Sequence, residues 1–312
     1  MRKLKMASFF AGCGGIDLGF HQTGKVETAY VNEIDKYPVH TYEINFGFKV
    51  DNRDIRLVKG EDIPSIDILA GGFPCQPFST CGKRLGFDDR RGNLFFEMAR
   101  LIKEKNPKVV FFENVASLKT FKDGFGLILE TLSVLGYFVK YKVLDAAKVT
   151  GIPQHRERIY IVGFKDKSAF DKFSFPEENM KPRSIRKYVD LDSKLEDRYY
   201  IKNLTKGKLI EDIADNSESF YCYRYGKPTK KMNNVCFTLL ASMGGTSIPS
   251  VKTKYGMRRL TPREAFNLQG FPEDFKLDIE NLSHSRLYKQ AGNSVCVPVI
   301  RKIAEQILEA VQ

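Results

Sequence analysis

The chain has 312 residues, 42% of them hydrophobic, with a formal net charge of +12 and a pI near 9.3. This composition is ordinary for a folded globular protein and excludes a fibrous or low-complexity chain. No block of like charge accounts for the excess, so we expect the cations on folded surfaces, with a polyanion such as nucleic acid as partner.

The six cysteines form no Cys-x-x-Cys pair and no closely spaced Cys/His set. We therefore expect no metal site and a reducing compartment, the cytoplasm. The basic start of the chain, MRKLKMASFF, has too short an apolar run for a signal peptide or a membrane span. A membrane location is not expected.

Short apolar strands alternate with helix-like stretches through the first half of the chain. We expect strands at 3–10, 26–32, 66–70, 109–113, 137–144 and 158–164. We expect helices at 16–22, 37–46, 94–105 and 125–135, and a C-terminal helix at 298–311. Because crossover helices join strands in parallel, the pattern predicts an α/β fold with a doubly wound, mostly parallel sheet.

After residue 164 the alternation gives way to irregular sequence rich in charge, Tyr and Ser. We expect a second, smaller irregular domain at 181–283, inserted in a discontinuous first domain of 1–180 plus 284–312. No acidic residue occurs from Ser219 to Arg263, whereas Lys and Arg recur there. The aromatic residues between them suit either contact with nucleic acid or packing in a core.

The first expected strand runs into a glycine loop, FAGCGG at 10–15, ahead of a helix. In this arrangement backbone amides can approach a ligand. Glu33 and Asp54 end the next strands, where α/β sheets place carboxylates that accept hydrogen bonds from ribose hydroxyls. Together these residues predict a site for a nucleoside-bearing cofactor.

Cys75 lies in GGFPCQPFS, directly after the expected strand at 66–70. Pro74 and Pro77 restrict the backbone on either side, so the thiol is expected on a stiff loop. A buried, unreactive cysteine is the alternative.

Two further charged groups stand beside apolar strands. Glu113 ends the apolar strand KVVFFENV, where its carboxylate can hold or donate a proton. Arg156 and Arg158 lie two apart at the start of a strand and point the same way if the strand is already formed there. A surface ion pair is the alternative for these arginines.

Taken in order, the motifs resemble those of the DNA (cytosine-5)-methyltransferase family, above all its short bacterial restriction-modification enzymes. The motifs are FAGCGG, NEID (32–35), GGFPCQPFS, ENV (113–115), QHRERIYIVG, RRLTPREAFNLQGFP (from 258) and QAGNSVCVPV (from 290). The resemblance implies an S-adenosylmethionine-dependent methyltransferase fold for the first, catalytic and cofactor-binding domain. It implies target recognition for 181–283.

The implied reaction transfers a methyl group from S-adenosylmethionine to C5 of a flipped cytosine in a specific duplex DNA sequence. Because C5 is a poor nucleophile, a thiolate must first add at C6, and the resemblance assigns this to Cys75. It assigns Glu113 to N3 and N4 of the ring, Arg158 to O2, and a supporting position to Arg156.

The remaining site residues are implied by the same resemblance or by the basic region. The cofactor contacts are Phe10, Ala11, Gly12, Gly14, Gly15, Glu33, Ile34, Asp54, Ile55 and Asn293. The DNA contacts are Ser79, Arg91, Arg224, Lys230, Lys231, Thr238 and Arg258. The expected partners are double-stranded DNA and a cognate restriction endonuclease of the same site, with the protein itself a nucleoid-associated monomer.

Three other functions share part of these features. A tRNA cytosine-5 methyltransferase is the main alternative, since Cys236-Phe237-Thr238 is similar to an element of that branch. A DNA-binding protein without the chemistry is disfavoured because Cys75, Glu113 and Arg158 are all present. A cysteine hydrolase is disfavoured because no histidine stands in a sequence pattern that would mark it as the catalytic partner of Cys75.

Overall fold

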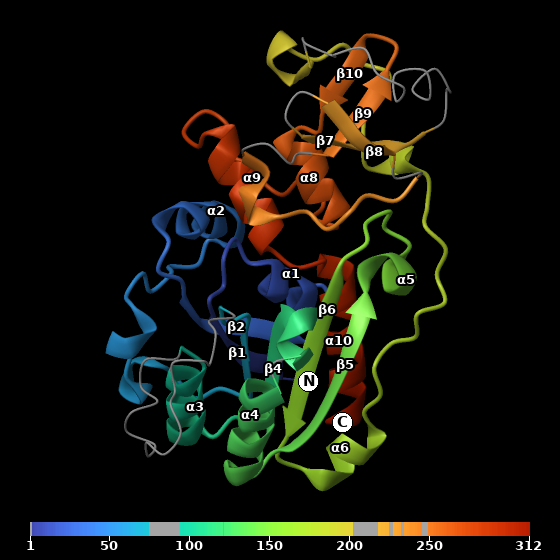
Figure 1. Ribbon diagram of the computed structural model, residues 1–312. Helices are drawn as coiled ribbons and strands as arrows, with labels where there is room; N and C mark the ends of the chain where they lie inside the picture. Colours follow the sequence, from blue (N-terminus) through green and yellow to red (C-terminus); the bar gives the residue numbers. More distant parts are fainter. Residues whose placement is uncertain are drawn as a thin grey trace. The chain divides into compact units, whose positions relative to one another are not determined.

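The structure, a computed structural model, describes residues 2–74, 94–120, 122–201, 218–224, 227–231, 234–244 and 249–312, with only the backbone at 122–123, 223–224, 227–231 and 244. It divides into two compact units (Figure 1). Unit 1 comprises Met1–Leu144, Glu157–Pro176 and Ile300–Gln312, and unit 2 comprises Asp145–Arg156 and Glu177–Val299.

Unit 1 is built on a six-stranded sheet in the order β2-β1-β3-β4-β6-β5 (Figure 1). Its strands are β1 Leu4–Phe9, β2 Val26–Asn32, β3 Ile68–Gly71, β4 Val109–Val115, β5 Phe138–Asp145 and β6 Glu157–Phe164. The first four pair in parallel, and β6 runs antiparallel to β4. The predicted mostly parallel sheet is therefore confirmed.

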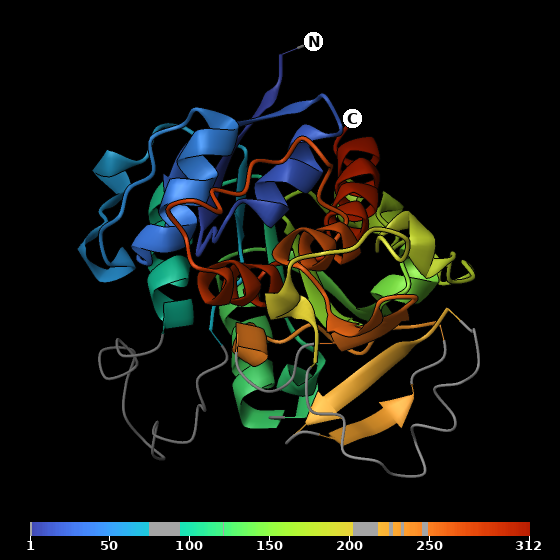
Figure 2. The ribbon, with the colours of Figure 1, turned by 90° about the horizontal axis from the view of Figure 1, so that it is seen from above.

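Helices cover both faces of this sheet (Figure 2). They are α1 Gly15–His21, α2 Lys36–Phe46, α3 Leu94–Lys105, α4 Lys122–Val134, α6 Lys167–Lys172 and, from Ile300, α10 Val297–Ala310, with short 3-10 turns at Ile55–Leu57, Gly60–Asp62 and Ala116–Thr120. Phe95 of α3 and Ile128 of α4 join Phe112 in one buried cluster. Phe20 of α1 packs edge-on against Phe111, whose side chain points to the opposite face because strand residues alternate. This is the doubly wound arrangement.

One buried carboxyl group ties together the elements around the glycine loop. Asp17 of α1 is fully buried and accepts hydrogen bonds from the hydroxyls of Ser8 (2.7 Å), Thr28 (3.1 Å) and Tyr42 (3.0 Å). These residues belong to β1, β2 and α2. Burial raises the pKa of Asp17, and the hydroxyl bonds oppose that shift. The network fixes α1 directly after the loop.

Unit 2 contains a four-stranded antiparallel sheet in the order β10-β9-β7-β8. Its elements are α5 Ala146–Thr150, β7 Phe220–Arg224, β8 Lys227–Lys231, β9 Pro249–Thr253, β10 Gly256–Arg259, α8 Pro262–Leu268 and α9 His284–Asn293, with 3-10 turns at Ile185–Lys187, Asp197–Tyr199 and Ala241–Gly244. The sequence analysis named no strands here, because segments such as KPTKK show no apolar alternation.

The boundaries of the two units differ from those of the predicted domains. Residues 145–156, 177–180 and 284–299 pack within unit 2, although the sequence analysis assigns them to the first domain. Packing does not tell which part of the chain reads DNA, so the division into catalytic and target-recognition domains stays a prediction. No helix in the described part of the chain is long and apolar enough to span a membrane.

Substitution of Gly19 tests the contact between α1 and α10. A Cβ there would lie 2.6 Å from Ile300 Cβ and 3.0 Å from the Arg301 nitrogen, so Gly19→Ala should lower the free energy of unfolding by about 1–3 kcal/mol. Gly126→Ala is the matched control, because Gly126 is an exposed helical glycine with open space around it. It should raise the stability by up to about 1 kcal/mol. Urea denaturation measures both, and an undiminished stability of Gly19→Ala would contradict the tight contact.

Candidate active site

The carboxyl ends of the parallel strands of unit 1 lie in one row. The residues that pair across these ends are Asn32, Phe9, Gly71 and Phe112. The residues that come next in the chain are Glu33, Phe10, Gly72 and Glu113. Ligands of open α/β sheets bind outside this edge. The parallel register therefore gathers the predicted cofactor and catalytic groups of unit 1 on a single edge.

The loop after β1 turns through left-handed backbone. Phe10, Gly12 and Gly14 have positive φ angles of 52°, 55° and 89°. A Cβ at Gly14 would collide with the rings of Phe46 and Tyr42, so only glycine lets the loop pack against α2. A Cβ at Gly12 would meet nothing within 4 Å. The backbone at Gly12 therefore borders open space that a ligand can enter.

Glu33 holds this loop from the neighbouring strand end. Its Oε2 accepts a hydrogen bond from the Gly12 N–H at 2.9 Å, and its Oε1 accepts one from the Asp35 N–H at 2.8 Å. Burial raises the pKa of Glu33, although these backbone bonds act in the opposite direction. The next residue, Ile34, is 58% exposed and offers an apolar surface to solvent.

Asp54 does not end a strand, contrary to the expectation, but caps the 3-10 turn Ile55–Leu57, and it forms an ion pair with Arg56 two residues on. Its Oδ1 accepts from the Arg56 backbone N–H at 3.0 Å, and its Oδ2 accepts from the guanidinium at 2.5 Å. The side-chain bond from Arg56 lowers the pKa of Asp54. The Ile55 and Ala11 side chains are buried in the core, so only their backbone groups are available to a ligand.

Asn52 binds the backbone that follows β2 and was not singled out from the sequence. Its Nδ2 donates to the backbone carbonyls of Glu33 at 2.7 Å and Ile34 at 2.9 Å. Its position two residues before Asp54 was the available signal. It fixes the backbone on which the Glu33 carboxylate is mounted.

Glu113 and Arg158 form an ion pair across two adjacent strands. The Oε1 atom of Glu113 lies 3.1 Å from the Nε of Arg158, and the two side chains are only 11% and 13% exposed. Strand β4 carries the acid and strand β6 carries the base. This sheltered pair can bind a polar ring with a carboxylate on one atom and a guanidinium on another.

The ENV motif also fixes the chain that leads to Cys75. The Asn114 side chain donates to the buried Phe73 carbonyl at 2.8 Å. A Cβ on Gly72 would stand 3.5 Å from Oε2 of Glu113, so the loop passes close to that carboxylate. Cys75 itself lies outside the described residues. Asn114 was not predicted as a site residue, and only its position beside Glu113 pointed to it in the sequence.

Arg156 is buried and its guanidinium binds backbone within unit 2. It donates to the carbonyls of Leu239 at 3.0 Å and Gly292 at 3.1 Å, and also to that of Ser294. These contacts flank Asn293, which is exposed at the end of α9. Arg156 therefore joins the Leu239 segment to the end of α9, and the structure gives it a positioning role.

Arg156 and Arg158 were expected to point the same way only if the strand is already formed at Arg156, and this condition is not met. Strand β6 begins at Glu157, so Arg156 precedes the strand and the alternation rule does not apply to it. Its guanidinium serves unit 2, whereas that of Arg158 binds Glu113 in unit 1.

Thr238 is held by the segment that carries Arg156. Its hydroxyl donates to the His155 carbonyl at 2.8 Å, and the His155 N–H donates to the Cys236 carbonyl at 2.8 Å. The Gln154 side chain accepts from the Leu239 N–H at 3.1 Å. The QHR tripeptide thus fixes the backbone around Thr238 and Leu239, a task that the sequence analysis did not foresee for Gln154.

Arg258 is not available to DNA, which corrects its place among the predicted DNA contacts. The side chain is 0% exposed and forms a two-point ion pair with Glu264, at 2.8 Å and 2.6 Å. It also donates to the carbonyls of Arg259 and Asp190. Glu264, the acid that pairs with Arg258, lies six residues later in the same motif, on α8.

The other predicted DNA contacts are described in part. Ser79 and Arg91 lie outside the described residues, as do the side chains of Arg224, Lys230 and Lys231. Among the aromatic residues interleaved with the basic ones, Phe220 and Tyr221 are fully buried, and Tyr221 packs against Met257. Of the two interpretations given for these aromatic residues, packing in a core therefore applies to Phe220 and Tyr221.

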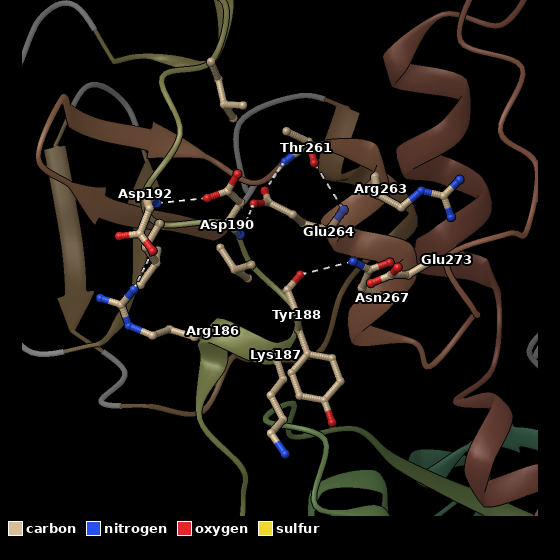
Figure 3. Close-up of a pocket in the computed structure, with 13 residues that line it drawn as sticks. Arg186, Lys187, Tyr188, Asp190, Asp192, Thr261, Arg263, Glu264, Asn267 and Glu273 are labelled. Carbon is tan, nitrogen blue, oxygen red and sulfur yellow. Dashed lines mark hydrogen bonds and ion pairs between the residues drawn. The ribbon is translucent and has the colours of Figure 1, made fainter.

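A cavity of about 420 Å³ in unit 2 lies between residues 186–195 and α8 (Figure 3). Within its lining, Arg186 pairs with Asp192 at 2.9 Å, and Glu264 accepts a hydrogen bond from the Asp190 backbone N–H at 2.9 Å. None of the predicted catalytic or cofactor residues lines it. The predicted chemistry is therefore not located in this cavity.

The fold of the chain is that of the S-adenosylmethionine-dependent methyltransferases: a doubly wound sheet whose carboxyl edge carries the predicted site residues. A methyltransferase of Schizosaccharomyces pombe, Dnmt2, superimposes with a TM-score of 0.75 and 17% identity, covering 100% of both chains. The Entamoeba histolytica methyltransferase EhMeth gives a TM-score of 0.72 at 19% identity, again over 100% of both chains. At these identities the likeness concerns the fold.

Sequence comparison identifies the family. Residues 4–309 match the family described as C-5 cytosine-specific DNA methylase. Type II methyltransferase M.Bsp6I of Bacillus sp. (strain RFL6) is 48% identical over 98% of this chain and 99% of that relative. M.HhaI of Haemophilus parahaemolyticus is 37% identical over 97% and 94%. The chain belongs to this family and is a DNA (cytosine-5-)-methyltransferase.

Replacing Arg258 tests its role inside unit 2. Arg258→Ala leaves Glu264 buried without its cation and should lower the free energy of unfolding by about 3–5 kcal/mol. Arg259→Ala, at the exposed neighbouring position, should change it by less than about 0.5 kcal/mol. Chemical denaturation, or the soluble yield if the variant does not fold, measures the difference. Equal effects of the two substitutions would argue against the buried ion pair.

Proposed function

We propose that the protein transfers a methyl group from S-adenosylmethionine to C5 of a cytosine in a specific duplex DNA sequence, through a covalent adduct between Cys75 and C6. The proposal rests on family membership together with one observation. The loop that leads to Cys75 is bonded to the same ENV motif whose Glu113 pairs with Arg158.

The chemistry explains why these three groups belong together. The Cys75 thiolate adds to C6, and the electron pair of the C5–C6 bond is pushed toward N3 and O2 and becomes available at C5. Glu113 donates a proton or hydrogen bond to N3 and accepts a hydrogen bond from the N4 amino group, and Arg158 stabilises the charge that develops on O2. The methyl group passes to C5 as its bond to the sulfonium breaks and leaves the neutral thioether S-adenosylhomocysteine. Loss of the C5 proton to a base, such as water, then restores the C5–C6 double bond and expels the thiolate.

The residues at the strand ends fit the methyl donor. S-Adenosylmethionine supplies an electrophilic methyl group on its sulfonium. The open space at Gly12 suits a part of the donor that binds backbone groups, and the half-buried Glu33 suits its ribose. The exposed Ile34 offers an apolar contact to the adenine. We include Phe10, Gly14, Gly15, Asp54 and Asn293 among the contacts, with Ala11 and Ile55 contributing backbone.

The relatives suggest the biological setting. Those cited above are named type II methyltransferases. We infer that this protein, too, methylates one short DNA site as a monomer and protects that site from a cognate restriction endonuclease. A cytosine inside a duplex is inaccessible to a thiolate, so the target base must be flipped out of the helix.

Replacement of the nucleophile gives the direct test. Cys75→Ser should reduce transfer of labelled methyl from S-adenosylmethionine to duplex DNA at least about a thousandfold, because an alcohol is a far weaker nucleophile than a thiolate. Its affinity for the same duplex should be retained. A matched substitution at the buried Cys296 should leave transfer intact. Undiminished transfer by Cys75→Ser would refute the adduct, and transfer to tRNA alone would favour the tRNA alternative.

The basic strand β8 provides a second test. Lys230→Ala with Lys231→Ala should weaken duplex binding and reduce the slope of log Kd against log salt by roughly one to two, since each phosphate contact contributes about 0.9. Lys103→Ala with Lys172→Ala, at exposed positions of unit 1, serves as the control. An unchanged slope in the β8 variant would remove these lysines from the DNA surface.

A further inference from the structure

His155 and Asp145 form a pair that the proposed reaction does not use. The His155 Nδ1 lies 2.8 Å from Oδ2 of Asp145. The histidine side chain is 58% exposed, whereas the aspartate side chain is only 3% exposed. A buried carboxylate thus holds one edge of an imidazole ring whose remainder faces solvent.

The carboxylate is itself fixed. Its Oδ1 accepts hydrogen bonds from the backbone N–H groups of Ala147 and Arg156, each at 3.1 Å. The backbone N–H of Asp145 is bound in turn by the Glu178 carboxylate at 2.8 Å. With both oxygens engaged, Asp145 has one orientation available. The ring therefore has one preferred position.

The backbone of His155 is held as firmly as its side chain. Its N–H donates to the Cys236 carbonyl, and its carbonyl accepts from the Thr238 hydroxyl, both at 2.8 Å. Freezing a side chain on the surface costs entropy, so a ring already held on both sides loses little more on binding a ligand. His155 is in this sense preorganised.

The bond at Nδ1 decides what the other nitrogen can do. A carboxylate only accepts, so Nδ1 carries a proton and donates to Asp145. No described residue bonds Nε2. When Nε2 is also protonated, the ring becomes a cationic donor directed outward, and its natural ligand is an anion.

Chain connectivity brings this donor near the target nucleotide. Three peptide units separate His155 from Arg158, so their Cα atoms are at most about 11 Å apart in any arrangement of the two units. Arg158 is the group proposed to contact O2 of the cytosine. The anion within reach of an exposed donor at this distance is a DNA backbone phosphate.

We infer that the His155–Asp145 pair is a phosphate-binding group for the DNA backbone next to the flipped cytosine. This inference rests on the proposed function. His155 makes the contact, and Asp145 is the positioning residue that holds the ring. The contact supplies affinity and register and carries no base specificity.

The test compares duplex binding by wild type, His155→Gln and His155→Lys across a range of salt concentrations, at slightly acid pH. The glutamine variant should weaken binding at low salt and reduce the slope of log Kd against log salt by about one. The lysine variant keeps a cation and should retain the slope. His284→Gln, which changes another histidine of unit 2, should leave it unchanged.

Single neutral methylphosphonates placed along the duplex locate the contact. Wild type should lose affinity at one phosphate beside the target, and His155→Gln should lose none there. An unchanged salt slope in His155→Gln overturns the inference. So does a fall in the methylation rate at saturating DNA with the slope intact, because the ring would then act in proton transfer. Wild-type methylation of the same duplex, measured in parallel, separates these outcomes from a failure of the proposed function.

Discussion

The parallel register of four strands is the constraint on which the site depends. Because β2, β1, β3 and β4 run in the same direction, their carboxyl ends meet at one edge. Residues far apart in sequence, such as Glu33, Gly72 and Glu113, are thereby brought to the same edge without any need for contact between them. Hydrophobic burial on both faces stabilises this register, since a shift by one residue would move every core side chain of a strand to the opposite face and disrupt its packing there.

Within that frame, side-chain donors bind backbone carbonyls and hold the loops. Asn52 binds the carbonyls behind Glu33, Asn114 binds that of Phe73, and Arg156 binds three carbonyls in unit 2. An unpaired buried carbonyl is costly, so each donor both satisfies the backbone and selects one loop conformation. Loops that carry reactive groups are preorganised in this way rather than by regular secondary structure.

Much of the fold followed from local pattern, and so did the candidate site. The apolar strands, the glycine loop and the proline-flanked Cys75 all have short-range physical causes. Arg258 and Arg156 did not follow, because an arginine in a motif looks the same whether it faces solvent or a buried acceptor. The partner of Arg258 is six residues away on α8, while Arg156 binds carbonyls more than eighty residues away. Only three-dimensional packing reveals these partners.

The sequence alone determined the class of chemistry: a cysteine flanked by prolines, carboxylates that follow apolar strands, and the order of motifs that marks a cytosine-5 methyltransferase. These features are local, because backbone restriction by Pro and Gly and the ends of apolar strands are set by neighbouring residues. The tertiary structure decided which charged groups remain available. It paired Glu113 with Arg158, withdrew Arg258 into a buried ion pair, and left His155 exposed on a buried aspartate. Burial and pairing depend on segments distant in the chain, which is why no local pattern could specify them.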